Sequence, residues 1–428
     1  MKLIYVVIDG MGDLPIEELG GQTTLEFAET PNMDCLASKG RLGLMYSVNK
    51  GIAPESDVAV ISILGYDPYE YHVGRGPLEA YGAGLDMKNG DLALRCNFAT
   101  LGRGRTILNR RAGRDLSTGE AAKLTEAMNR KVELESHPAE FEFRNTQGHR
   151  GVLVIRSKEG ALSGDITNTD PAYERVGGGL GVAKADVDMV LMECAPLEDT
   201  ESARISARLV NEFTEKSHEV LERHDVNKKR VAQGRLKANI ILSRDAGDEL
   251  PRFFSIGERY GVRFACLADM PVERGISRLA GMHLVEIPPP SSDVKADSIL
   301  RAEKLLGLLP SFDCFYIHLK GPDEPGHDGK FELKAQLIAG IDEFFFGKLL
   351  PKIDLEETLI CVTADHATPC SLKAHSDDPV PLLIAGAGVE ADGIGRFSER
   401  ECRNGSLGLL ERGTKLMPIL MQFLKRAA

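Results

Sequence analysis

Six carboxylate and imidazole side chains have the types and spacing of metal ligands. They are Asp9, Asp323, His327, Asp365, His366 and His375. One Asp and one His are adjacent, and another such pair is four residues apart, a spacing that places both side chains on one turn of a helix. A lone aspartate after a strand is more often a turn or cap residue, so the prediction depends on the whole set. Mixed oxygen and nitrogen donors favour Mn²⁺, Zn²⁺ or Fe²⁺ over Ca²⁺ and also accept Mg²⁺. Since the set is large enough for two ions, the sequence predicts a metalloenzyme.

Ser56 is the candidate nucleophile. It follows Pro54 and Glu55 and precedes an apolar helical segment, so we expect it at a helix N-terminus. The alternative role is a helix N-cap without chemistry. Beside two metal ions a serine alkoxide becomes accessible, and the helix dipole would stabilise the added charge of a phosphoserine. Local sequence leaves both roles open.

Groups suited to anion binding occur mainly in the middle of the chain. The candidates are Arg110, Arg111, Arg114, His149 and Asp170 and, just ahead of one metal ligand, Lys320. A guanidinium fork matches carboxylate and phosphate geometry. The alternative for the arginines is a solvated basic surface.

The elements that would position these residues alternate between strands and helices. Branched and aromatic runs predict buried strands over Leu3–Ile8, Arg263–Leu267, Cys314–Leu319, Thr358–Thr363 and Pro381–Ala385. Helical periodicity is present over Thr30–Lys39, Ser56–Leu64, Ser298–Leu308, Leu333–Leu350 and Lys415–Leu424. This alternation predicts an α/β core with a mainly parallel sheet flanked by helices. Ligands collect beyond the carboxyl ends of such strands, and Asp9, Asp323 and Asp365 each closely follow a predicted strand.

The middle of the chain has a different pattern, which predicts an inserted α+β domain over residues 91–197. Its expected strands are Phe141–Phe143, Val152–Ile155 and Met189–Met192, and a long amphipathic helix over Glu201–His224 leads back to the core. The core domain would then be discontinuous and comprise residues 1–90 and 198–428.

Composition restricts the partners and the compartment. The 428 residues carry a net charge of −12, which disfavours nucleic acid and anionic membranes as partners. The 8 cysteines are scattered without a C-x-x-C pair, as expected of free thiols in a reducing compartment. No signal peptide or membrane span is evident. We therefore expect a cytoplasmic protein. The sequence indicates no oligomeric state.

Several ordered motifs resemble one known family. They are Val7-Ile8-Asp9-Gly10-Met11-Gly12-Asp13, Pro54-Glu55-Ser56-Asp57, Gly74-Arg75-Gly76-Pro77-Leu78-Glu79-Ala80, Arg110-Arg111-Ala112-Gly113-Arg114 and Asp365-His366-Ala367-Thr368-Pro369-Cys370. Over nearly its whole length the chain resembles the archaeal-type, cofactor-independent phosphoglycerate mutases of the alkaline phosphatase superfamily. The resemblance implies an alkaline phosphatase-like core and interconversion of 3-phosphoglycerate and 2-phosphoglycerate through a phosphoserine, without 2,3-bisphosphoglycerate or another organic cofactor.

The resemblance also implies roles for individual residues. One metal would be held by Asp323, His327 and His375, and the other by Asp9, Ser56, Asp365 and His366. Mn²⁺ or Mg²⁺ is expected, and Zn²⁺ and Co²⁺ are alternatives. A small phosphorylated acid would be bound by the inserted domain, where His149, Arg110, Arg111, Arg114 and Asp170 are the nearest candidates.

Three positions depart from the family pattern. Asn109 and Asn168 stand where members often have Asp, and Asp245 stands where they tend to have Gly. These positions are expected nearer the substrate than the metals, so they bear on which acid accepts the phosphoryl group. The alternative function is a metal-dependent phosphotransferase or phosphohydrolase on another small acid, such as a homoserine kinase-like enzyme. A second class is a catalytically silent metal-binding protein with the same fold.

Overall fold

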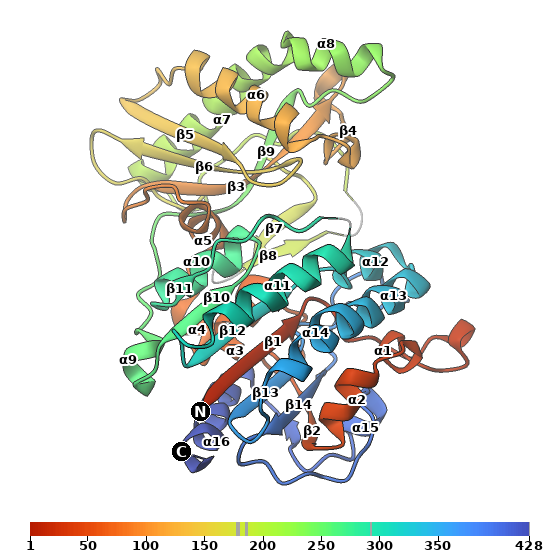
Figure 1. Cartoon of the computed structure of the whole chain (residues 1–428). Helices are drawn as coiled ribbons and strands as arrows, with labels where there is room; N and C mark the ends of the chain where they lie inside the picture. The colour runs from red at the N-terminus through yellow and green to blue at the C-terminus, as the bar shows by residue number, and fades with distance from the viewer. Residues whose placement is uncertain (177–179, 185–186, 292, 428) are drawn as a thin grey trace. The chain divides into compact units, whose positions relative to one another are not determined.

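The computed structural model describes residues 1–176, 180–184, 187–291 and 293–427 (Figure 1). The chain forms two compact units, one of Met1–Tyr71 with Arg252–Ala428 and the other of His72–Pro251. The second unit is longer than the segment 91–197 predicted from sequence. Elements on both sides of that segment pack with its sheet, namely α5 (Arg75–Gly82), α7 (Glu201–Glu222) and β9 (Ile240–Gly247).

The first unit is built on one eight-stranded sheet. Its strands lie in the order β11 (His283–Leu284), β10 (Phe264–Leu267), β12 (Cys314–Leu319), β1 (Lys2–Ile8), β13 (Thr358–Thr363), β14 (Val380–Gly386), β2 (Gly40–Met45) and β15 (Gly408–Leu410). All neighbouring pairs are parallel except the two that involve β14. The five predicted strands are confirmed. The central ones are almost wholly buried, which agrees with their continuous apolar sequences.

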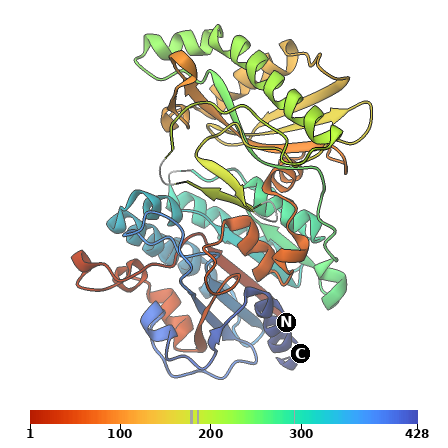
Figure 2. The same ribbon diagram turned by 180° about the vertical axis from the view of Figure 1, so that it is seen from behind.

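Helices cover both faces of this sheet (Figures 1 and 2). They are α1 (Thr24–Phe27), α2 (Pro31–Ala37), α3 (Ser56–Ile63), α4 (Pro68–Tyr71), α9 (Ile256–Tyr260), α10 (Pro271–Leu279), α11 (Val294–Leu308), α12 (Asp323–Asp328), α13 (Phe331–Ile341), α14 (Gly347–Leu349), α15 (Glu399–Cys402) and α16 (Leu416–Ala427). The five predicted helices are present with ends shifted by a few residues. The long predicted segment Leu333–Leu350 is divided, because a π-helical turn over Asp342–Phe346 separates α13 from α14. The predicted α/β core is therefore confirmed.

The second unit is an α+β structure, as predicted. Its antiparallel sheet has the order β4 (Ile107–Asn109), β3 (Leu92–Leu101), β6 (Arg150–Ser157) and β5 (Ala139–Asn145), and β9 also pairs with β3. Helix α6 (Thr118–Lys131) packs on β5 and α7 packs on β9, and α8 (Asp225–Ala232) contacts α6. A separate hairpin is formed by β7 (Tyr173–Val176) and β8 (Leu180–Ala183).

One predicted strand of this unit is wrong. Residues Met189–Met192 form only an isolated bridge between Val190 and Thr106. Three of these four side chains are exposed, whereas Leu191 is buried against β4 and β9. The segment therefore lies along the sheet without joining its ladder.

The eight cysteines are free, and all but Cys35 are buried. Among the described residues, no helix is both long enough and apolar enough to cross a bilayer.

Candidate active site

The candidate metal ligands meet at one edge of the large sheet. Strands β12, β1 and β13 are neighbours and run in parallel, so their carboxyl ends lie side by side. Asp9 directly follows β1, Asp365 follows β13, and α12 begins at Asp323 soon after β12. Gly10 allows these segments to approach, because it has a φ of +61° and a Cβ there would lie 2.8 Å from Cα of Asp323.

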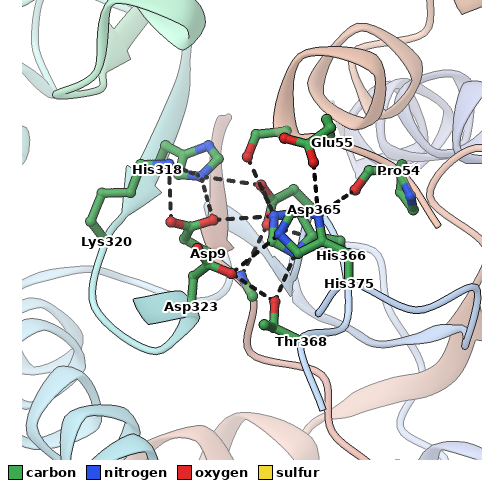
Figure 3. Close-up of polar contacts among 12 residues, drawn as sticks. Asp9, Pro54, Glu55, His318, Lys320, Asp323, Asp365, His366, Thr368 and His375 are labelled. Carbon is green, nitrogen blue, oxygen red and sulfur yellow. Dashed lines mark hydrogen bonds and ion pairs between the residues drawn. The ribbon is translucent and has the colours of Figure 1, made fainter. Parts of the chain in front are cut away.

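A first cluster joins Asp323, His327 and His375. Figure 3 shows Asp323 and His375 of this cluster. Nε2 of each histidine lies 3.4 Å from Oδ1 of Asp323. Each Nδ1 faces a backbone carbonyl, that of Lys373 at 3.2 Å and that of Pro54 at 2.8 Å, so each Nδ1–H donates there. The two Nε2 lone pairs then face each other at 3.2 Å. A shared cation would resolve that repulsion, and the backbone bonds orient both rings for it.

A second cluster contains Asp9, Ser56, Asp365 and His366. Nε2 of His366 lies 3.5 Å from Oδ1 of Asp9, 3.3 Å from Oδ2 of Asp365 and 3.3 Å from Oγ of Ser56. Its Nδ1 lies 3.0 Å from the hydroxyl of Thr368. That hydroxyl donates its own hydrogen to Asp323 at 2.7 Å, so it accepts from Nδ1–H and leaves Nε2 as an electron-pair donor.

Two oxygens in this cluster lack hydrogen-bond partners. Oδ1 of Asp9 and Oδ2 of Asp365 are buried and receive no hydrogen bond. Burial raises the pKa of Asp9, but the neighbouring groups, with the Lys320 ammonium foremost, outweigh it and hold that pKa well below its usual range. Burial likewise opposes ionisation of Asp365, and His366 nevertheless lowers its pKa. Ionised, buried and unsatisfied oxygens are destabilising by themselves, so these donors fit a bound cation.

Ser56 is the first residue of α3, and Glu55 occupies the cap position. The N-cap alternative for Ser56 is therefore wrong. Its side chain is 9% exposed and its hydroxyl lies beside His366. The backbone N–H groups at the start of a helix lack intrahelical partners and favour anions. The position thus combines a hydroxyl beside a candidate metal ligand with a local environment that stabilises negative charge.

A cavity of about 490 Å³ lies beside the arginine candidates of the second unit. Its lining includes Arg110, Arg111 and Arg114. Arg110 forms a two-pronged ion pair with Asp170, with contacts of 2.8 and 2.6 Å, and Asp170 also accepts from Arg244 at 3.1 Å. Arg110 is therefore held by a buried carboxylate, whereas Arg114 is exposed to solvent.

Positive charge also surrounds His149. Burial, together with the charges of Arg150, Arg111, Arg244 and Arg114, lowers the pKa of His149 to about 3. His149 is thus a neutral side chain within a cationic environment. Among the described residues, no carboxylate lies within salt-bridge distance of Arg111 or Arg150. The guanidinium groups of Arg111 and Arg150 therefore keep their positive charge available to an anion.

The three departures from the family pattern have structural roles. Oδ1 of Asn109 accepts from the backbone N–H of Arg111 and of Gly113, at 2.9 and 3.0 Å. Asn168 donates to the carbonyl of Tyr173 at 3.1 Å and accepts from N–H of Asp245 at 3.3 Å. The Asp245 carboxylate lies 3.4 Å from Nε of Arg244. All three therefore support the backbone and charges around the arginines.

Sequence reasoning missed several residues near the metal ligands. His318, next to last in β12, lies 3.7 Å from Asp365 and 4.0 Å from Asp9, and it joins them in a third potential ligand group. Glu273 contacts Lys320 at 2.6 Å from α10. Thr368 links both clusters. The position of His318 near the end of a predicted buried strand could have indicated a place near the metal ligands. No feature of the sequence indicated such a place for Glu273.

Comparisons with known proteins agree on one family. A family model described as 2,3-bisphosphoglycerate-independent phosphoglycerate mutase matches residues 37–227. The enzyme of that name from Aeropyrum pernix is 45% identical over 99% of this chain and 100% of its own, and that from Pyrococcus abyssi is 41% identical over 100% and 98%. Among solved structures, a Pyrococcus horikoshii protein has 34% identity and a TM-score of 0.79 over 100% of this chain and 98% of its own. A cofactor-independent phosphoglycerate mutase from Thermoplasma acidophilum has 32% identity and a TM-score of 0.62 over 99% and 100%.

Proposed function

Because this chain belongs to the family of 2,3-bisphosphoglycerate-independent phosphoglycerate mutases, we propose that it interconverts 3-phosphoglycerate and 2-phosphoglycerate through a phosphoserine at Ser56. The observation that carries this proposal is the place of the Ser56 hydroxyl, 3.3 Å from Nε2 of His366 at the start of α3. A nucleophile there stands beside unsatisfied carboxylate oxygens. Phosphoryl transfer depends chiefly on such positioning and on charge stabilisation.

We assign two groups of ligands to divalent ions. One group is Asp323, His327 and His375, and the other is Asp9, Ser56, Asp365 and His366. Divalent ions supply positive charge that favours the serine alkoxide and stabilises charge on the phosphoryl oxygens. Mn²⁺ or Mg²⁺ suits these donors, Zn²⁺ and Co²⁺ are alternatives, and no organic cofactor takes part.

The chain's own residues perform the transfer. Oγ of Ser56 bonds to phosphorus as the bond between phosphorus and one glycerate oxygen breaks. The proton lost from Ser56 is balanced by the proton gained by the leaving oxygen. The second step is the reverse, with the other glycerate hydroxyl as the acceptor and Ser56 restored. The N-terminal N–H groups of α3 favour the phosphoserine between the two steps.

We propose that the second unit supplies the groups that bind the anionic substrate. The candidates are Arg110, Arg111, Arg114, His149 and Asp170. Asp170 would orient Arg110 through its two-pronged ion pair, and Arg111 would contribute charge that no described carboxylate neutralises. A neutral His149 can donate or accept a hydrogen bond without opposing the arginines. The free cysteines suit a reducing compartment, so we place the reaction in the cytoplasm.

The test is a coupled enolase assay with purified protein, 3-phosphoglycerate and Mn²⁺, without 2,3-bisphosphoglycerate. Wild type is expected to form 2-phosphoglycerate, and Ser56→Ala should lose at least about 10³-fold in kcat, because no nucleophile remains. The matched control is Ser62→Ala, which removes a buried, unpartnered hydroxyl from the same helix. No product from wild type would overturn the proposal, and ATP-dependent phosphorylation of homoserine instead would identify the alternative function.

A further inference from the structure

A buried ion-pair network lies behind the second cluster. Nζ of Lys320 is 3.1 Å from Oδ2 of Asp9 and 2.6 Å from Oε1 of Glu273. It also lies 3.4 Å from Nε2 of His318. Figure 3 shows Lys320 and His318 directed toward Asp9 from the end of β12. Glu273 comes from the first turn of α10 and is fully buried.

The contacts of Lys320 determine which nitrogen of His318 carries its hydrogen. An ammonium group has three N–H donors and no acceptor, so Nε2 of His318 must be the acceptor in their contact. The hydrogen of His318 is then on Nδ1, which donates to the hydroxyl of Tyr316 at 2.8 Å. Lys320 thus hydrogen-bonds to Glu273 and His318 and forms an ion pair with Asp9.

The network leaves Asp9 with two unlike oxygens. Oδ2 is bound to Lys320, whereas Oδ1 has no hydrogen bond and faces Nε2 of His366 at 3.5 Å. Oδ2 of Asp365 is also without a hydrogen bond. If Lys320 were not held from the other side, its ammonium group would be drawn to these two oxygens, which a divalent ion also needs. Glu273 is the group that holds it from the other side.

We propose that Glu273 is a positioning residue of the metal centre: it fixes the Lys320 ammonium on Oδ2 of Asp9 and thereby keeps Oδ1 of Asp9 and Oδ2 of Asp365 available to a divalent ion. Lys320 is then a fixed structural cation rather than a substrate ligand. His318 completes the arrangement as the third acceptor. The inference rests on the proposed function only in taking Asp9 and Asp365 as metal ligands.

The test measures ion binding without substrate, so its outcome does not depend on the mutase reaction. Protein stripped of metal is titrated with Mn²⁺ in equilibrium dialysis, and two binding steps are expected for wild type. Glu273→Gln should weaken one step by about tenfold or more, because the released ammonium competes for its ligands. The other step, at Asp323, His327 and His375, should stay within about threefold. Glu303→Gln is the matched control, since Glu303 pairs with Lys348 at 2.9 Å on the surface.

A second variant distinguishes positioning from a general loss of structure. Glu273→Gln combined with Lys320→Met removes both charges, so no ammonium remains to compete, and the weakened step should recover to within about threefold of wild type. A double variant as weak as Glu273→Gln alone, or unchanged binding in Glu273→Gln, would overturn the proposal. If Glu273→Gln does not fold, Glu273→Asp retains the charge but retracts it by one methylene. That variant should weaken the same step selectively, and equal weakening of both steps or of neither would refute the proposal.

Discussion

Replacing Thr368 with valine tests whether the two ligand clusters act as one site. The side chain is fully buried, and valine has nearly the same shape, so the substitution removes only a hydroxyl. That hydroxyl donates to Oδ1 of Asp323 at 2.7 Å and accepts from Nδ1–H of His366 at 3.0 Å. The variant therefore takes one orienting hydrogen bond from a candidate ligand in each cluster.

The expected loss follows from those two bonds. Removing a partner that orients a metal ligand typically lowers metal affinity or activity by about 10–100-fold, which is about 1.4–2.7 kcal/mol. The buried Nδ1–H of His366 would also lose its acceptor, a destabilisation of about 1–3 kcal/mol. We expect kcat to fall about 30-fold at a fixed Mn²⁺ concentration, with part of the loss recovered at higher Mn²⁺.

The assay is the coupled enolase reaction over a range of Mn²⁺ concentrations. Thr368→Ser keeps the hydroxyl and should retain most of the activity. Thr363→Val is the matched control, because its buried hydroxyl donates to the carbonyl of Pro381 at 2.8 Å and contacts no candidate ligand in the described structure. It should lose stability but keep its kcat. Activity of Thr368→Val within threefold of wild type at every Mn²⁺ concentration would refute the reasoning, and so would an equal loss in Thr363→Val.

Two further predictions concern stability. Removing divalent ions by chelation should lower Tm, and Mn²⁺ at 100 times its Kd should restore about 2.7 kcal/mol per site; a Tm unaffected by both treatments would argue against a metal centre. Burial, with smaller contributions from Asp13 and Glu26, raises the pKa of Glu399 from 4.5 to about 7. Because the folded state holds this proton more tightly, stability should fall by about 3 kcal/mol as pH rises from 4.5 through 7. Glu399→Gln should remove that fall in urea unfolding at pH 5 and 8.5, and an equal pH dependence in both proteins would contradict the assignment.

The large sheet was predictable because its central strands are buried on both faces. Such strands must be apolar throughout, so β1, β12 and β13 are evident as continuous runs. In the second unit, β3 carries Arg95 and Asn97 within its length, and its strand character depends on pairing with β6 and β9. Met189–Met192 shows the converse, since this apolar segment forms only an isolated bridge and exposes three of its four side chains.

The same distinction applies to the site. Parallel strands place their carboxyl ends together, so Asp9, Asp323 and Asp365 lie at one edge of the sheet because β12, β1 and β13 are neighbours. Glu273 reaches the site because β10 pairs with β12, and no local pattern specifies that pairing. Its role therefore required the tertiary structure.

The loop that carries Arg110, Arg111 and Arg114 shows how Asn109, a departure from the family pattern, affects the backbone and the charge of the site. Ala112, Gly113 and Arg114 all have positive φ, at 46°, 80° and 58°, and each of the two non-glycine residues is strained by about 1–2 kcal/mol. Asn109 offsets part of this strain through two hydrogen bonds to the loop backbone, each worth about 1 kcal/mol. A carboxylate oxygen would accept the same two bonds. Asn109 therefore preserves the loop geometry. Compared with an aspartate at this position, it places one negative charge fewer beside the arginines, which strengthens their attraction for an anion. The departure at Asn109 by itself gives no reason to expect a different acid as substrate.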